Sequence, residues 1–168
     1  MEQNISEHII NIYRQEDLIR AFEFDLEKIG AHVINHLPIS NIEKLSEVNH
    51  YEELIARMKL EGIESSGHLK EANLLVSTLE TLHEKLLKSD ADYAKIYEDA
   101  KSAVDENIRL SENKITSAIQ ICLNAVYGFL LLRLNGKEID EKEKSKVEKF
   151  GGLLAYLSAK HKEIANSN

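Results

Sequence analysis

The sequence contains one proline and seven glycines among its 168 residues, whereas these two residue types together make up roughly 12% of an average protein. Tight turns draw heavily on both types. A β-rich fold with many turns is therefore disfavoured, and the shortage of turns predicts long helices. Apolar residues make up 43% of the chain and charged residues 30%, which is the balance of a folded globular protein rather than of a disordered tail or a membrane protein.

The chain also has a single cysteine and no excess of positive charge. Cys122 cannot form an internal disulfide and lacks the companions of a structural zinc site, which favours the reducing cytoplasm. The N-terminus has no apolar signal-peptide core. The 29 acidic and 21 basic residues give a net charge of −8, and the densest basic stretch, residues 142–149, is interleaved with glutamates. Nucleic acid is therefore not expected as a partner.

The first predicted helix covers residues 5–36. An apolar side chain recurs every seven residues along it, at Ile5, Ile12, Ile19, Leu26 and Val33. This spacing places one continuous apolar stripe against a partner helix. Pro38 ends the helix, because the residue before a proline is driven out of the α region.

Four further amphipathic helices are predicted, over residues 41–61, 69–88, 91–110 and 141–164. Ser40 and Glu43 form a capping box, in which each side chain binds the free backbone N–H of the other residue. Asp90 can cap the helix over 91–110 with its side chain. Asp140 opens the last of these helices, whose apolar seam either closes a bundle or meets a second copy of the protein, so a homodimer is one expected arrangement.

The helix predicted over residues 115–134 differs from the others, because it is apolar from Ile121 to Leu132 except for Asn124 and Gly128. A helix without a polar face is expected to be covered on all sides. It is too short and too interrupted for the roughly 20 apolar residues of a bilayer span, so no membrane is expected. Gly128 costs roughly 1 kcal/mol of helix propensity, and the close approach of another helix is the expected compensation.

These elements predict an all-α protein, a single-domain bundle of about six helices over residues 1–168 with the helix over 115–134 at its centre. No linker rich in glycine, serine or proline divides the chain.

Glu16 interrupts the apolar stripe of the first predicted helix, between Ile12 and Ile19. Arg20 follows it by four residues, which is the favourable orientation for an ion pair on a helix, and Asp17 can share the same guanidinium. Burial of the carboxylate requires full hydrogen bonding. Three interpretations stay open: these groups form a structural polar network, or Glu16 stands in a pocket as a ligand anchor or general base, or the helix rotates and exposes them.

Asn124 is the second unusual polar residue, because it lies on the most apolar helix. A buried amide without a partner costs roughly 1 to 3 kcal/mol. We therefore expect Asn124 to contact Glu16, Asp17 or Arg20.

The remaining candidates for chemistry are weaker. Glu47 with His50 and Glu80 with His83 have the Glu-x-x-His spacing of di-iron helical bundles. Such a site also needs a glutamate from each of two further helices, and the segment 115–134 contains no acidic residue. Neither a metal nor another cofactor is expected. The sequence also lacks a P-loop, a dinucleotide-binding fingerprint and a nucleophile elbow.

Several short motifs follow one another along the chain. They read YRQEDLIRA at 13–21, GHL at 67–69, CLNAVYG at 122–128, GKEI at 136–139 and LSAK at 157–160. Together they resemble the domain-of-unknown-function family numbered 4924, found mainly in Bacteroidetes, over nearly the whole chain. The resemblance implies an all-helical bacterial protein of about this length and implies no activity.

The sequence thus favours a non-catalytic binding or scaffolding module, whose partner is another protein or a small molecule. The alternative is a small-molecule binder or an enzyme with a pocket around Glu16, Arg20 and Asn124.

Overall fold

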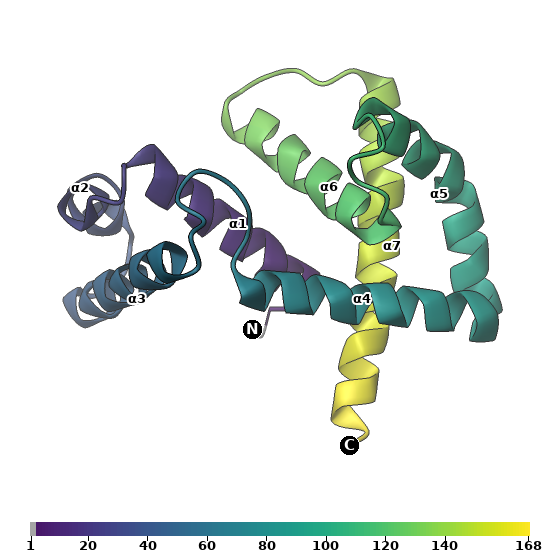
Figure 1. The fold of residues 1–168 in the computed structure, drawn as a ribbon, viewed down its shortest axis with the longest axis horizontal. Helices are drawn as coiled ribbons and strands as arrows, with labels where there is room; N and C mark the ends of the chain where they lie inside the picture. The colour runs from purple at the N-terminus through teal and green to yellow at the C-terminus, as the bar shows by residue number, and fades with distance from the viewer. Residues whose placement is uncertain (1–2) are drawn as a thin grey trace. The chain divides into compact units, whose positions relative to one another are not determined.

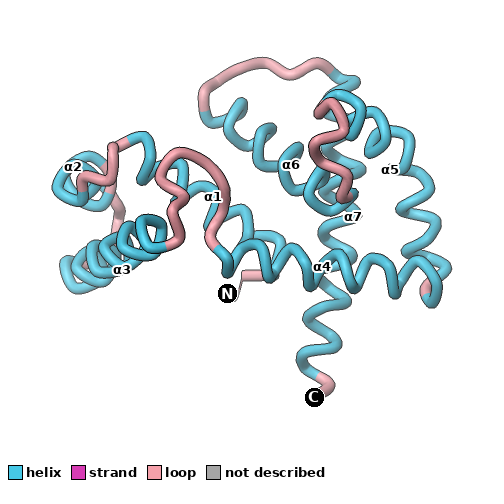
Figure 2. The backbone as a smooth tube through the Cα atoms, viewed as in Figure 1, coloured by secondary structure: helices cyan, strands magenta, loops and turns pink. Residues whose placement is uncertain are grey.

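The computed structural model describes residues 3–168, and helices joined by loops account for most of them (Figures 1 and 2). The helices are α1 (Ile5–Ala21), α2 (Leu26–His32), the short 3-10 helix η1 (Ile34–His36), α3 (Asn41–Leu60), α4 (Lys70–Ser89), α5 (Ala91–Leu110), α6 (Ala118–Leu134) and α7 (Glu141–Asn166). No strand occurs among the described residues. The predicted all-α fold is confirmed, with seven α-helices where about six were expected.

Side-chain caps fix where several helices begin. The Ser40 hydroxyl accepts a hydrogen bond from the Glu43 N–H at 3.2 Å, and the Glu43 carboxylate accepts one from the Ser40 N–H at 2.8 Å. This is the predicted capping box of α3. Asp90 accepts from the Tyr93 N–H at 3.0 Å, and Asp140 accepts from the Glu143 N–H at 2.8 Å. Local sequence therefore sets the starts of α3, α5 and α7, as predicted.

The helix predicted over 5–36 is wrong as a continuous element, because the chain leaves the helical path at residues 22–25. Glu23 and Phe24 adopt left-handed backbone conformations with φ of 55° and 63°. Their N–H groups bond back to Arg20 and Ile19, which closes the end of α1. Asp25 then caps α2 by accepting from the Lys28 N–H at 3.1 Å. The apolar spacing continues through this break, so periodicity alone does not reveal it.

The described chain forms two compact units, and their boundaries fall inside α1 and α4. The first unit contains the N-terminal segment up to Ile10 together with Leu74–Asn168, and the second contains Asn11–Asn73. The single domain expected from the absence of a linker stays a prediction.

The core of the first unit lies where α5, α6 and α7 pack against one another (Figure 1). Its fully buried side chains include Tyr93, Val104, Leu123, Phe150 and Leu157. The seam of α7 therefore closes this unit, which is one of the two roles predicted for it. A homodimer stays a prediction.

In the second unit, α3 contacts both α2 and η1. Its buried core includes Tyr13, Ile19, Ile29, Ile34 and Met58.

The expectation that the most apolar helix is covered on all sides is correct only for its first half. Ile119, Cys122 and Leu123 in α6 are buried, but no residue from Asn124 onward in this helix is. Leu132 is 39% exposed and Leu134 is 62% exposed. The helix also begins at Ala118 rather than at residue 115, because Ser117 accepts from the Gln120 N–H at 3.1 Å and caps it.

Gly128 does not allow the close helix approach that the sequence predicted. A Cβ atom built at this position meets no atom within 4 Å, apart from its own helix backbone and chain neighbours. The position is therefore open space beside α6 rather than a tight helix contact.

We predict that Gly128→Ala raises the free energy of unfolding by about 0.5–1 kcal/mol, because alanine gains helix propensity without a clash. Gly67→Ala should lower it by about 1 kcal/mol or more, because Gly67 has a φ of 95° that alanine adopts only with strain. Urea denaturation of both variants measures the two effects. Equal destabilisation by both would contradict the open space at Gly128.

Candidate functional site

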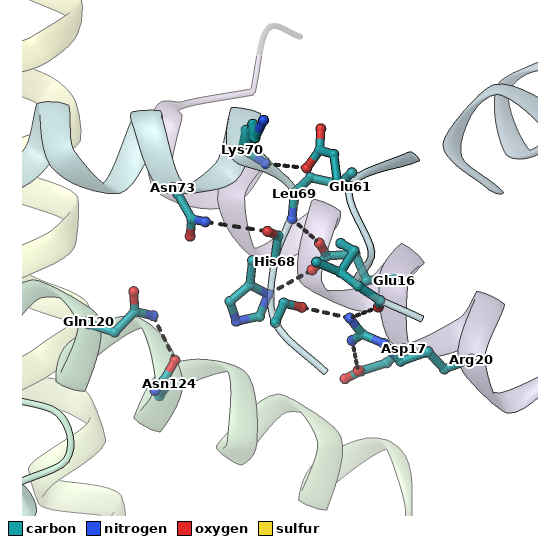
Figure 3. A network of polar contacts seen from close by, with 12 residues as sticks. Glu16, Asp17, Arg20, Glu61, His68, Leu69, Lys70, Asn73, Gln120 and Asn124 are labelled. Atoms are coloured by element: carbon teal, nitrogen blue, oxygen red, sulfur yellow. Dashed lines mark hydrogen bonds and ion pairs between the residues drawn. The ribbon is translucent and has the colours of Figure 1, made fainter. Parts of the chain in front are cut away.

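Glu16 is a buried carboxylate on α1, only 1% exposed. Its Oε1 atom lies 2.7 Å from Nδ1 of His68, and its Oε2 atom accepts a hydrogen bond from the Leu69 N–H at 2.7 Å (Figure 3). An ionised carboxylate has no proton to give, so Nδ1 of His68 is the donor when Glu16 is charged. Both oxygens of Glu16 are thus engaged within the second unit.

These bonds supply a cap that α4 lacks in its own sequence. Leu69 occupies the residue before α4, where serine, threonine, aspartate or asparagine is preferred. Glu16 binds the Leu69 N–H, and Glu61 accepts from the Lys70 N–H at 2.8 Å. Two carboxylates from elsewhere in the chain therefore face the positive end of the helix dipole. Asn73 adds a bond from Nδ2 to the His68 carbonyl at 3.3 Å.

Arg20 holds the loop that precedes α4. Its Nη2 group donates to the carbonyl oxygens of Ile63 at 2.9 Å and Gly67 at 2.6 Å. Its Nη1 group lies 3.4 Å from Oδ1 of Asp17, which is one of the two carboxylates predicted to share the guanidinium. The other, Glu16, bonds to His68 and Leu69 instead, so the expected pairing of Glu16 with Arg20 is wrong. Nε of Arg20 is buried without a hydrogen-bond partner among the described residues. Asp17 and Arg20 therefore pair, while Glu16 faces His68 and Leu69.

Sequence reasoning missed His68, although its ring is central to this cluster. The ring stacks on Tyr13 with centroids 3.8 Å apart and planes 21° from parallel. The available signal was the unfavourable Leu69 directly before a strong helix, because a helix without its own capping residue needs a distant acceptor.

Asn124 lies in the first unit, on α6. Its Oδ1 atom accepts a hydrogen bond from Nε2 of Gln120, one turn earlier, at 2.9 Å. The predicted contact between Asn124 and the Glu16 cluster would join the two units, and it stays a prediction.

Cys122 and His83 are buried in the first unit. Burial raises the pKa of the Cys122 thiol to about 12, so the thiolate needed for nucleophilic attack is absent near neutral pH. His83 shares a 2.6 Å hydrogen bond between Nδ1 and the Tyr93 hydroxyl. Burial, the main cause, lowers the pKa of His83 against the opposing charges of Glu84 and Glu80.

No group of three or more His, Cys, Asp or Glu side chains within residues 3–168 is arranged to hold a metal ion. No helix in this part of the chain is long and apolar enough to cross a membrane.

Two cavities of the first unit adjoin at the exposed half of α6. One, the cationic cavity, has a volume of about 340 Å³ and is lined by Phe129, Arg133, Lys137, Ile139 and Lys144. The other, the apolar cavity, has a volume of about 250 Å³, and its apolar lining includes Ala125, Gly128, Leu132, Val147 and Phe150. Phe129 and Ile139 belong to both, so the two cavities share a wall.

Polar groups also line the apolar cavity. The Lys146 side chain is only 8% exposed, and its ammonium lies 3.1 Å from Oε2 of Glu106 and 3.5 Å from Oε1 of Glu143. The bond and charge of Lys146 lower the pKa of Glu106. Oδ1 of Asn107 is buried without a hydrogen-bond partner among the described residues. An apolar cavity with a few converging polar groups is the usual form of a small-molecule site.

The fold and its buried groups define an all-helical protein whose most buried carboxylate caps a helix. The chain belongs to the family described as domain of unknown function (DUF4924), which matches residues 1–168. A comparison with curated proteins and a comparison with solved structures each gave no match.

We predict that Glu16→Met lowers the free energy of unfolding by about 1–3 kcal/mol, because it leaves the buried Leu69 N–H without an acceptor. Glu16→Gln should recover part of the loss, since its amide oxygen can still accept. Urea denaturation measures the stability, and hydrogen exchange at the Leu69 amide localises the effect.

Glu61→Met is the matched control, because it removes a similar cap bond that is exposed to water. Its cost should stay within about 0.5 kcal/mol. Equal losses for Glu16→Met and Glu61→Met would show that burial of the Glu16 cap does not matter.

The lowered pKa of His83 gives a pH-dependent prediction. The unfolded chain takes up a proton near the ordinary value of 6.5, whereas the folded protein resists it. The stability associated with neutral His83 is fully present above pH 6.5 and is lost as pH falls through the lower folded-state pKa. His83→Asn keeps a hydrogen-bonding group near Tyr93 without a titrating ring. Its unfolding free energy should fall less than that of the parent between pH 7 and about pH 5, and parallel losses would refute the assignment.

Proposed function

We propose that this protein is a non-catalytic binding module and that its binding site is the pair of adjoining cavities on the first unit. The supporting observation is an unmet charge beside an apolar hollow. Arg133, Lys137 and Lys144 line the cationic cavity. The Arg133 guanidinium lies 5.8 Å from the centroid of the Phe129 ring, and none of the three cations forms an ion pair with another residue in 3–168. The overall net charge of −8 makes this local concentration of cations unusual for the chain.

The reactive side chains are buried or already hydrogen-bonded to other parts of the protein, which supports a non-catalytic role. Glu16 uses both oxygens on His68 and Leu69. Cys122 is fully buried, and His83 is bonded to Tyr93. A general base or nucleophile must reach a substrate atom, and these groups face the protein interior.

The alternative function, a ligand pocket or active site around Glu16, Arg20 and Asn124, draws less support from the local geometry. Arg20 already donates to two backbone carbonyls and to Asp17. Glu16 binds the backbone at the start of α4, and Arg20 binds the backbone of the loop before it. Both side chains therefore stabilise the local structure.

The proposed location is the cytoplasm. The lone Cys122 is free and buried, which suits a compartment in which thiols stay reduced. A protein partner, including a second copy of the chain, is compatible with the same binding role.

A thermal-shift screen of the full chain against a set of small metabolites tests the proposed site, with Gly128→Leu as the blocking variant. Leucine at Gly128 should extend into the apolar cavity, because the position is helical and open. A compound that binds the folded parent raises its melting temperature by a few degrees at saturating concentration. This shift should disappear in Gly128→Leu, and mass spectrometry should recover the compound unchanged.

Gly152→Leu is the matched control. Gly152 lies on α7, is exposed, and is equally open around its Cβ position, but it does not line either cavity. Compounds that stabilise the parent should stabilise this variant equally. Chemical conversion of a compound would contradict the non-catalytic role, and shifts that survive in Gly128→Leu would contradict the site.

A further inference from the structure

The two adjoining cavities follow one face of α6. Ala125, Gly128, Phe129, Leu132 and Arg133 occur at intervals of three, four, seven and eight residues from the first, which places them on the same side of a helix. The first four belong to the apolar cavity, and Phe129 and Arg133 belong to the cationic cavity. The surface therefore changes along α6 from an apolar hollow to a group of positive charges.

The charges that line this surface are unbalanced. Four cations, Arg133, Lys137, Lys144 and Lys146, stand against one carboxylate, Glu143. Lys146 is already held by Glu106 and Glu143. The uncompensated charge is thus at Arg133, Lys137 and Lys144, all of which are exposed to solvent.

Resting on the proposed function, we propose that the ligand is an amphipathic oxyanion, with an apolar chain in the apolar cavity and a carboxylate or phosphate head in the cationic cavity. The Arg133 guanidinium presents paired N–H donors that match the oxygens of either head group. Lys137 and Lys144 add point charges on the same side. The apolar chain of the ligand lies against Gly128, Leu132 and Phe150, where burial of apolar surface favours binding.

The open space at Gly128 fits this arrangement. A side chain at residue 128 would occupy the apolar cavity without meeting another atom within 4 Å of its Cβ. Glycine therefore keeps the hollow beside α6 free at the expense of helix propensity. Asn107 also lines the apolar cavity, and its unpartnered Oδ1 atom can accept a hydrogen bond from a hydroxyl group on the bound ligand.

Isothermal titration calorimetry of the full chain tests the ligand class with three probes: octanoate, octyl phosphate and octylamine. All carry a linear alkyl chain of seven or eight carbons, so the charge and type of the head group are the main difference between them. We expect octanoate, octyl phosphate or both to bind at one site, and octylamine to bind at least about tenfold more weakly, because its charge is repelled.

Variants separate the two halves of the proposed site. Gly128→Leu should abolish oxyanion binding, and Gly152→Leu should bind like the parent. Lys137→Gln should weaken binding by about tenfold through loss of one charge-assisted contact. Lys137 lies in the exposed connection before α7, so this variant keeps the test valid if circular dichroism shows that Gly128→Leu does not fold. High salt should weaken the parent toward the Lys137→Gln affinity.

The outcomes distinguish the ligand class from the site itself. If octylamine binds more tightly than the two oxyanions, and Gly128→Leu abolishes its binding, the ligand is not an oxyanion. The proposed function, binding at these cavities, would still stand. The same holds if none of the three probes binds while compounds from the thermal-shift screen depend on Gly128. Oxyanion binding that is unchanged in both Gly128→Leu and Lys137→Gln would overturn the cavities as the site, and with them the proposed function.

Discussion

The start of α4 depends on a carboxylate that comes from 53 residues earlier in the chain. The Glu16 carboxylate is accommodated in the interior because His68 and the Leu69 N–H replace the water that burial removes. In return, α4 gains a negative group at its positive end, which Leu69 itself cannot provide. The same contact positions the loop before α4 against α1. One side chain thereby connects the folding of α1, the loop and α4 in the second unit.

This dependence supports the proposal that the Glu16 cluster has a structural rather than a catalytic role. A group poised for catalysis normally keeps an oxygen or nitrogen free for the substrate. Here Arg20 donates hydrogen bonds to two backbone carbonyls, and Tyr13 stacks on the His68 ring. Nε of Arg20 is the one buried polar atom of this cluster that has no hydrogen-bond partner among the described residues. Beside α6, the unpartnered Oδ1 of Asn107 and the exposed cations Arg133, Lys137 and Lys144 lie next to apolar residues that are only partly covered.

The sequence allowed prediction of those features that local chemistry decides. Ser40, Asp90 and Asp140 each bind an N–H three residues later, so the starts of α3, α5 and α7 needed no knowledge of the fold. The break at residues 22–25 was missed, because the left-handed conformations of Glu23 and Phe24 are not favoured by those residue types. Glu16 was found through its place in an apolar stripe, but His68 was not, since no local pattern joins residues so far apart. Nor does the mostly apolar sequence of α6 reveal which of its turns are covered.

Cys122 can report when the first unit opens. It is the chain's only thiol, and it is enclosed in the core of the first unit. An alkylating reagent can modify it only after α6 separates from its neighbours, so the labelling rate follows the opening of that unit alone. The segment from Asn11 to Asn73 carries no such group. The two halves of the chain can therefore be followed by different chemistry in the same sample: thiol modification for one, and amide exchange around Leu69 for the other.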